Sequence, residues 1–246
     1  MIAANRDEFY ARPAQPPHQL RATPWVVGGQ DVSAGGTWLG VNGYGVVAGI
    51  LNRRSDMPPD PAKRSRGQLC LDALARSRAA DAVAYVRAEP HDRYNPFNLL
   101  VADPAEAFVV GNGTGVMQSV RLTTGLHVLT NLDLDDMECP RLAKSYALFG
   151  DLTPQLDGSS PEQLRQHLRK ALSDHSTPLD PRNPVPTNNL CMHSERFGTR
   201  SSTLLFYDAS QHRFHMWHAD GPPCRTDYQE VILPEPFTLD NTKRAR

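Results

Sequence analysis

The chain has little of what marks membrane, secreted or redox proteins. It has only four cysteines, and no two of them form a Cys-x-x-Cys pair, which argues against a zinc knuckle or a redox motif and fits reduced thiols. They are Cys70, Cys139, Cys191 and Cys224. No apolar run approaches the roughly twenty residues of a membrane helix, and the charged N-terminus has no secretory h-region. We therefore expect a cytoplasmic protein without a transmembrane segment.

An excess of charge of one sign is also missing. The 26 basic and 27 acidic side chains give a net charge of −1 and a pI near 6.7, so no basic surface for a phosphate backbone is expected. Nucleic acid is therefore excluded as an expected partner, and a small molecule remains. Internal repeats are absent too, and 246 residues can bury a core without disulfides or metals. The sequence predicts a single domain over residues 1–236 and a disordered tail over 237–246.

Short β-rich runs dominate the first half of the chain. The runs 37–41 and 46–51 are joined by Asn and Gly residues that favour a hairpin turn. Further strands are expected at 25–27, 97–102, 107–110, 116–122, 126–131, 202–207 and 214–217. The proline-rich passage from Pro13 to Pro24 is expected to be an irregular surface loop, as is the connection from Pro178 to Pro186.

Helices are expected between the two groups of strands. Ser65 is a candidate N-cap for a helix to Ala79, and a shorter helix is expected over 81–88. A third is expected over 140–149. Ser160-Pro-Glu-Gln163 has the signature of a capping box and predicts a helix to about Leu172. Strands in two groups separated by helices indicate an α+β fold.

The first thirteen residues concentrate polar groups after a short apolar run. Asn5, Arg6, Asp7 and Glu8 follow residues 1–4, which predicts a strand whose end presents an amide, a guanidinium and two carboxylates. A strand usually has roughly five or six residues, so four are few. We therefore expect that the native protein has residues upstream of Met1.

This stretch resembles the opening of the NRDE family, whose animal members are called transport and Golgi organisation protein 2. Four further motifs match in family order along nearly the whole chain. They are Ala34-Gly-Gly-Thr-Trp-Leu-Gly-Val-Asn42, Ser65-Arg-Gly67, Leu129-Thr-Asn131 and Phe197-Gly-Thr-Arg-Ser-Ser-Thr203.

The NRDE family is similar to the cysteine N-terminal nucleophile hydrolases, which implies a four-layer αββα sandwich of two mainly antiparallel sheets. In those enzymes the N-terminal cysteine attacks an amide, and its own α-amino group, which titrates near 8, serves as the base. Family members normally begin Met-Cys, and this chain lacks the matching cysteine. The resemblance thus implies a C–N hydrolase that is inactive as encoded, with the nucleophile either upstream of Met1 or lost.

The resemblance also implies roles for individual residues. Asp7 would hold the α-amino group, and Arg6 would lower the pKa of the thiol, although the family's arginine usually precedes the aspartate by more residues. Asn131 matches the asparagine that donates to the oxyanion, and Arg200 matches the late arginine of the site. Candidate substrate-binding residues are Asn5, Glu8, Trp38, Asn42 and Asn52.

Each of these residues also has a purely structural interpretation. Residues 5–8 could form an ion-pair network, and residues 35–38 a tight turn before a core tryptophan. Arg200 could anchor a strand through a carboxylate, and Asn131 could cap a turn. Cys191, near His193, is a weaker candidate nucleophile because it has no α-amino group.

No cofactor and no metal site are expected. The evenly spaced His212, His215 and His218 would not share one face of a strand, so they are poor candidates for a metal site. The alternative to hydrolysis is a binding or trafficking module, because animal members of the NRDE family are associated with Golgi organisation, secretion, and haem or lipid homeostasis. Such a protein would hold haem or an acyl chain without cleaving it.

Overall fold

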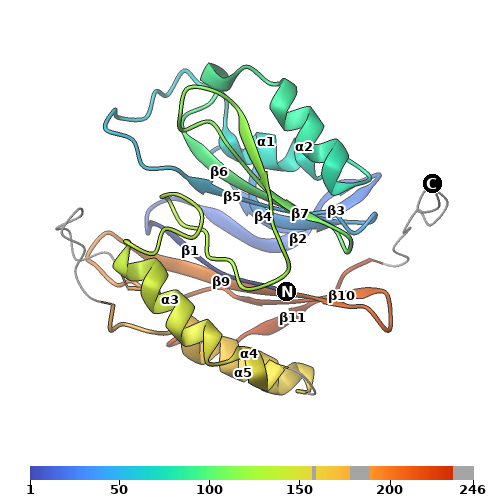
Figure 1. Ribbon diagram of the computed structural model, residues 1–246, viewed down its shortest axis with the longest axis vertical. Coiled ribbons are helices and arrows are strands. Elements are labelled where there is room, and N and C mark those ends of the chain that lie inside the picture. The colour runs from blue at the N-terminus through green and yellow to red at the C-terminus, as the bar shows by residue number, and fades with distance from the viewer. Residues whose placement is uncertain (157–158, 178–188, 235–246) are drawn as a thin grey trace. The chain divides into compact units, whose positions relative to one another are not determined.

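The computed structural model describes residues 1–156, 159–177 and 189–234 (Figure 1). The chain folds into two compact units, which we describe separately. The four-stranded unit comprises Met1–Arg12, Thr124–Phe206 and His215–Val231. The seven-stranded unit comprises Pro13–Thr123, Tyr207–Phe214 and the segment from Ile232. The predicted tail over 237–246 and the Pro178–Pro186 connection lie outside the described residues.

The four-stranded sheet has the order β1-β9-β10-β11. Its strands are β1 (Ile2–Phe9), β9 (Phe197–Asp208), β10 (Arg213–Ala219) and β11 (Gln229–Val231). Residues 5–8 lie inside β1 and not beyond its end, so the strand is longer than its apolar residues predicted. β1 pairs with β9 antiparallel, and the register shifts at Arg6/Asp7, so that Arg200 is the extra residue of a β-bulge.

Three helices belong to the same unit: α3 (Pro140–Gly150), α4 (Thr153–Leu156) and α5 (Pro161–Leu172). The predicted capping box of α5 is present, because Ser160 and Gln163 each accept a backbone N–H from the other. α5 packs on β1, and α3 packs on α5 (Figure 1). The apolar face of α5, with Leu168 and Leu172, joins Leu204 and Trp217 of the sheet in one core.

The seven-stranded sheet is an antiparallel meander from β2 to β8 in chain order. Its strands are β2 (Ala14–Ala22), β3 (Trp25–Asp31), β4 (Thr37–Asn42), β5 (Val47–Asn52), β6 (Phe97–Ala102), β7 (Ala107–Gly111) and β8 (Gln118–Arg121). Helix α1 (Arg66–Ala73) packs on β4 and β5, and α2 (Ala79–Ala88) on β6 and β7 (Figure 1). A 3-10 turn, His91–Arg93, precedes β6.

Most predicted elements are confirmed, and the exceptions have local causes. The 37–51 hairpin, the α3 and α5 helices and the strand at 97–102 agree with β4, β5, α3, α5 and β6. The helix after Ser65 is shorter than predicted and ends at Ala73. The loop predicted over Pro13–Pro24 is wrong, because β2 occupies it; β2 is an edge strand, where proline is tolerated.

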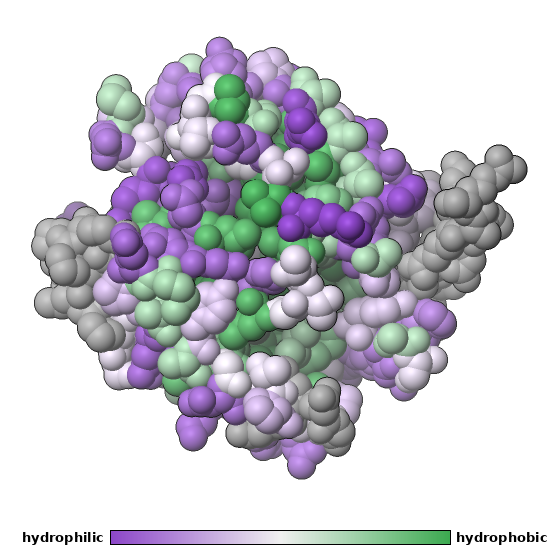
Figure 2. Space-filling model, in the orientation of Figure 1, coloured by the Kyte–Doolittle hydropathy of each residue, from purple (hydrophilic) through white to green (hydrophobic). Residues whose placement is uncertain are grey.

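None of the helices in the described part of the chain has the length and apolar character needed to cross a bilayer. Figure 2 shows hydrophilic and hydrophobic residues interspersed over the visible face.

Two glycines from separate sequence motifs meet in the seven-stranded unit. A Cβ atom built on Gly36, just before β4, would lie 2.2 Å from the carbonyl carbon of Gly67 in α1. Real Cβ atoms do not approach backbone so closely, so only glycine allows α1 to lie against the start of β4 at this point. The motifs 34–42 and 65–67 therefore share one packing contact.

Replacing Gly36 with alanine is expected to lower the free energy of unfolding by about 3 kcal/mol, because the backbone at Gly67 must move away. Urea denaturation followed by circular dichroism measures this. The matched control is Gly150→Ala in α3, where the added methyl group meets no atom within 4 Å and unfolding should change little. Equal stability of the two variants would contradict the contact.

Candidate functional site

Asp7 is the most heavily engaged carboxylate of the N-terminal motif. Its Oδ2 accepts from Nη2 of Arg141 at 2.8 Å, and its Oδ1 accepts from the hydroxyl of Thr199 at 2.7 Å. Arg141 is in the first turn of α3, and Thr199 is the partner of Asp7 in β9. Both charged side chains are largely shielded, with exposures of 14% for Asp7 and 21% for Arg141. Asp7 therefore connects α3 to the sheet.

The bulge beside Asp7 contains buried polar atoms without a protein partner. Nε of Arg200 and Oγ of Ser201 are both buried, and neither has a hydrogen-bond partner among the described residues. A buried donor without a partner costs free energy, so such atoms need a water molecule or a ligand. The bulge therefore places two buried polar atoms that lack a partner next to Thr199, the residue of β9 that pairs with Asp7.

Asn5 has a structural role on the same face of β1. Its Nδ2 donates to the carbonyl of Leu172, at the end of α5, at 2.9 Å and to that of Leu190 at 2.7 Å. Side chains two apart in a strand share a face, so Asn5 and Asp7 both point towards the helices. Oδ1 of Asn5 is buried and has no partner among the described residues.

Arg6 and Glu8 point to the opposite face of β1 by the same alternation. Nη2 of Arg6 lies 3.9 Å from Glu8, and Nε of Arg12 lies 3.8 Å from the same carboxylate. The structure thus separates Arg6 and Glu8 from Asn5 and Asp7, although the four are consecutive. The role predicted for Arg6 at a thiol stays a prediction.

Asn131 is exposed and lies in a loop. The strand predicted over 126–131 is wrong, because the backbone N–H of Val128 is bound by the side chain of Asp135 and not by a neighbouring strand. Within the described ranges, no hydrogen bond joins Asn131 to Asp7 or Arg200. Its predicted role as an oxyanion donor stays a prediction.

The remaining predicted residues belong to the seven-stranded unit. The ring of Trp38 lies against Gly29, where a Cβ atom would be 2.1 Å from it. Asn42 is fully buried and makes four hydrogen bonds to main-chain groups, so its amide has no remaining capacity for a ligand. Asn52, at the end of β5, is exposed. The structural interpretation is favoured for Asn42.

A second group of side chains in the four-stranded unit was not predicted as a site. It joins two thiols and two imidazoles, and we call it the thiol–imidazole cluster: His175, Cys191, His193 and Cys224. The Cys-x-His spacing of Cys191 and His193 is the one local signal for it. His175 and Cys224 are distant in the sequence and carry no pattern that links them to this pair.

The three evenly spaced histidines near the C-terminus lie apart, in separate contacts. His212 bonds to Tyr207, His215 stacks on Trp217, and His218 bonds to Thr203 at 2.9 Å. Among the described residues, the candidate metal ligands form one group, and it does not include these three.

The burial of His218 predicts that the stability of the protein depends on pH. Burial lowers the pKa of His218 to about 4, and Asp220 opposes the shift. An unfolded histidine titrates near 6.5, so between pH 6.5 and 4 the unfolded chain binds the proton and the folded chain does not. We expect stability to fall by roughly 3 kcal/mol over this window as pH decreases.

The measurement is the urea midpoint of wild type and His218→Gln from pH 7.5 to 4. The variant keeps a hydrogen-bonding group near Thr203 but cannot titrate, so it should lose less stability than wild type. Parallel curves for the two proteins would show that His218 does not contribute.

Comparison with solved structures shows the fold. The structure matches a penicillin V acylase from Agrobacterium tumefaciens with a TM-score of 0.53 and 14% identity, over 93% of this chain and 81% of that one. It matches a Caenorhabditis elegans N-acylethanolamine-hydrolyzing acid amidase ortholog with a TM-score of 0.54 and 15% identity, over 94% of each chain. The chain therefore has the α+β fold of the N-terminal nucleophile hydrolase type, as the family resemblance implied.

Comparison with known protein sequences shows to which family the chain belongs. The chain is 28% identical over 245 residues to a Transport and Golgi organization protein 2 homolog of Bos taurus, covering 86% of this chain and 83% of the relative. The Homo sapiens homolog is 29% identical over 237 residues, with the same coverage. The family model described as Transport and Golgi organisation 2 matches residues 1–218, and the chain therefore belongs to this family.

Proposed function

We propose that this protein carries the polar part of an amide-hydrolase site of the N-terminal nucleophile type, which cleaves the C–N bond of a small acyl amide. The observation that carries the proposal is the buried Nε of Arg200, which has no partner in the described structure and lies at the bulge opposite Asp7. Such a donor can receive the carboxylate or carbonyl oxygen of a substrate.

The fold supports this assignment. The solved structures that share it are named as a penicillin V acylase, an N-acylethanolamine-hydrolyzing amidase and a conjugated bile acid hydrolase. Identities of 9–15% carry no substrate information, so the proposal extends only to the class of bond.

The proposed chemistry needs a thiol that precedes Met1 in the native protein. That thiol attacks the amide carbonyl, the amine leaves with a proton, and water then hydrolyses the thioester. Asp7 can still accept a donor, because a carboxylate has about four lone-pair sites and two are used. It would orient the α-amino group that serves as the base, while Arg200 and Asn131 would donate to substrate oxygens.

The test is amine release from penicillin V, an N-acylethanolamine and a conjugated bile acid by protein purified from its native host. Intact-mass measurement gives its first residue. Arg200→Lys keeps the charge but loses the Nε donor, and activity should fall by about 10²–10³. The control is Arg196→Ala, an exposed arginine just before β9, which should keep full activity. Hydrolysis that does not change in Arg200→Lys contradicts the assignment.

A second candidate function is binding without cleavage of an acyl chain or haem. The positions of the cysteines favour binding without cleavage. Cys70 is in the core of the seven-stranded unit, and none of the four thiols is hydrogen-bonded to Asp7 or Arg200 in the described structure. Titration with haemin and with an acyl-CoA tests this candidate. Saturable binding by protein that begins at Met1 and cleaves no amide would support it, and no saturable signal would reject it.

A further inference from the structure

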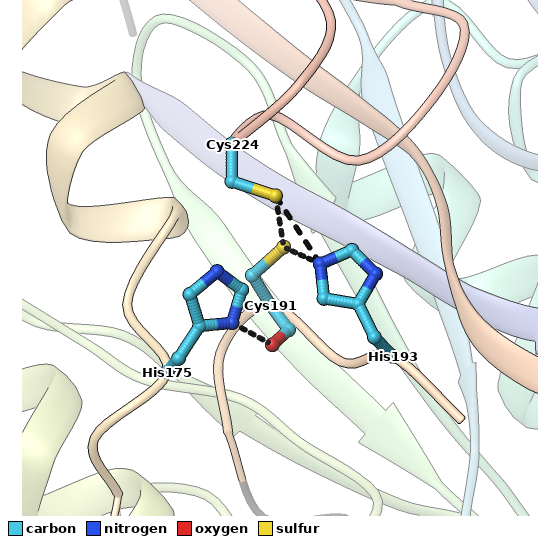
Figure 3. A group of neighbouring side chains, drawn as sticks. All are labelled: His175, Cys191, His193 and Cys224. Atoms are coloured by element: carbon cyan, nitrogen blue, oxygen red, sulfur yellow. Dashed lines mark hydrogen bonds between the residues drawn. The ribbon is translucent and has the colours of Figure 1, made fainter.

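The thiol–imidazole cluster brings together side chains from three segments of the four-stranded unit (Figure 3). His175 follows the end of α5, Cys191 and His193 precede β9, and Cys224 lies between β10 and β11. One ligand atom from each residue lies within 4.8 Å of all the others. Cys191 is buried, Cys224 is half-buried, and both histidines are exposed.

The spacing of three of these atoms is that of a tetrahedral metal site. Sγ of Cys191 lies 3.6 Å from Nε2 of His193 and 3.6 Å from Sγ of Cys224, and Nε2 of His193 lies 3.2 Å from Sγ of Cys224. With Zn–S near 2.3 Å and Zn–N near 2.0 Å, a tetrahedron has S–S edges of about 3.8 Å and S–N edges of about 3.6 Å. The two sulfur atoms are not bonded to each other in the structure, because an S–S bond is about 2.05 Å long.

A hydrogen bond orients the ring of His175 as in a metal ligand. Its Nδ1 lies 2.9 Å from the carbonyl oxygen of Cys191. Because a carbonyl oxygen can only accept, Nδ1 carries a hydrogen, and in the neutral imidazole this tautomer leaves the lone pair on Nε2. A bond from one ring nitrogen to a backbone carbonyl is the usual way in which proteins orient a histidine that ligates metal through the other. The dashed line in Figure 3 shows this bond, with the second nitrogen facing away from the carbonyl.

The chemistry of the donors selects the ion. We infer that the thiol–imidazole cluster is a tetrahedral zinc site. Two thiolates and two neutral imidazoles suit Zn²⁺ and not Mg²⁺ or Ca²⁺, which prefer carboxylate and carbonyl oxygens. Two thiolates also balance the two charges of zinc, so the loaded site is neutral in its partly buried setting.

Two of the four side chains have pKa values shifted from their usual range. Burial lowers the pKa of His193, and the charge of Arg225 adds to this effect. Burial raises the pKa of Cys191, so without a cation this thiol stays protonated. A bound divalent ion would reverse the second effect, because metal coordination deprotonates a thiol.

Zinc bound by the cluster would order the hydrogen bonds that connect it to Asp7. Met192 lies between two of the proposed ligands, and its backbone N–H donates to the hydroxyl of Thr199 at 2.9 Å. That hydroxyl donates to Asp7. The inference does not depend on the proposed hydrolase function, because a zinc ion would order this segment whether or not the protein cleaves amides.

The test begins with the full chain expressed without a histidine tag. We expect about one zinc per chain by elemental mass spectrometry, and an intense visible spectrum of tetrahedral, thiolate-bound cobalt after Co²⁺ replacement. Cys191→Ser and Cys224→Ser should each weaken zinc binding by roughly 100-fold or more in chelator competition, and His175→Gln by about 10- to 100-fold. The matched control is Cys139→Ser, a buried thiol outside the cluster, which should keep its zinc.

The melting temperature of wild type, measured with and without a chelator, tests the zinc site even if the serine variants fold poorly. Zinc-dependent stabilisation of wild type supports the site. The inference is overturned if wild type binds no more zinc than the Cys191→Ser, Cys224→Ser double variant. It is also overturned if the protein carries copper instead, or if peptide mapping finds Cys191 and Cys224 joined in a disulfide.

Discussion

Replacing Asn42 with alanine is expected to lower the free energy of unfolding by about 3–5 kcal/mol. Its Nδ2 donates at 2.7 Å to the carbonyl oxygens of both Leu74 and Arg76, which follow α1. Its Oδ1 accepts from the backbone N–H groups of Tyr44 and Val46 in the hairpin turn. Alanine would leave four main-chain groups without partners, and each buried one costs about 1–3 kcal/mol before relaxation.

Urea denaturation of Asn42→Ala measures this, with Asn52→Ala as the control. Asn52 is an exposed asparagine of the same hairpin, and its replacement should change stability by less than about 0.5 kcal/mol. A loss below about 1 kcal/mol for Asn42→Ala would mean that the hydrogen bonds do not hold α1 to the hairpin. The ligand-binding role predicted for Asn42 would then regain support.

Replacing Asp7 with alanine is expected to cost about 2–4 kcal/mol of stability. The change leaves the largely shielded guanidinium of Arg141 without its 2.8 Å partner and removes the acceptor of the Thr199 hydroxyl. The expected loss is below that of a fully buried pair, because 21% of the Arg141 side chain is exposed.

A double-mutant cycle with Arg141→Ala separates structure from chemistry. We expect a coupling energy of about 1–3 kcal/mol between the two positions. If Asp7 also orients a catalytic group, Asp7→Asn should lose amide hydrolysis far beyond the loss in Arg141→Ala, although Asn nearly preserves its shape. Equal losses of activity would assign Asp7 to the structural network alone.

Local signals predicted most of the fold. The hairpin turn after Val41 and the capping box at Ser160 depend on residues close in sequence, and both are confirmed. Predictions were wrong where the structure of a segment depends on a residue distant in sequence or on the position of a strand in its sheet. β2 contains prolines because it is an edge, and residues 126–131 are a loop because Asp135 takes the N–H of Val128.

The candidate site shows the same division. The motifs drew attention to Asp7 and Arg200, and the structure places them on adjacent strands at a bulge. The partner of Asp7, Arg141, is 134 residues away in the chain, and no sequence pattern links the two. The thiol–imidazole cluster was not predicted as a site because only Cys191 and His193 are neighbours in the sequence, and His175 and Cys224 join them only in the folded unit.

The most direct test of the hydrolase proposal is to trap the acyl-enzyme. Native protein is mixed with an acyl amide, quenched in acid within seconds, and digested for peptide mass spectrometry. The proposal predicts an acyl group on an N-terminal cysteine upstream of Met1, with less of it in Arg200→Lys. An acyl group on Cys191, or no adduct on protein whose first residue is Met1, would contradict it.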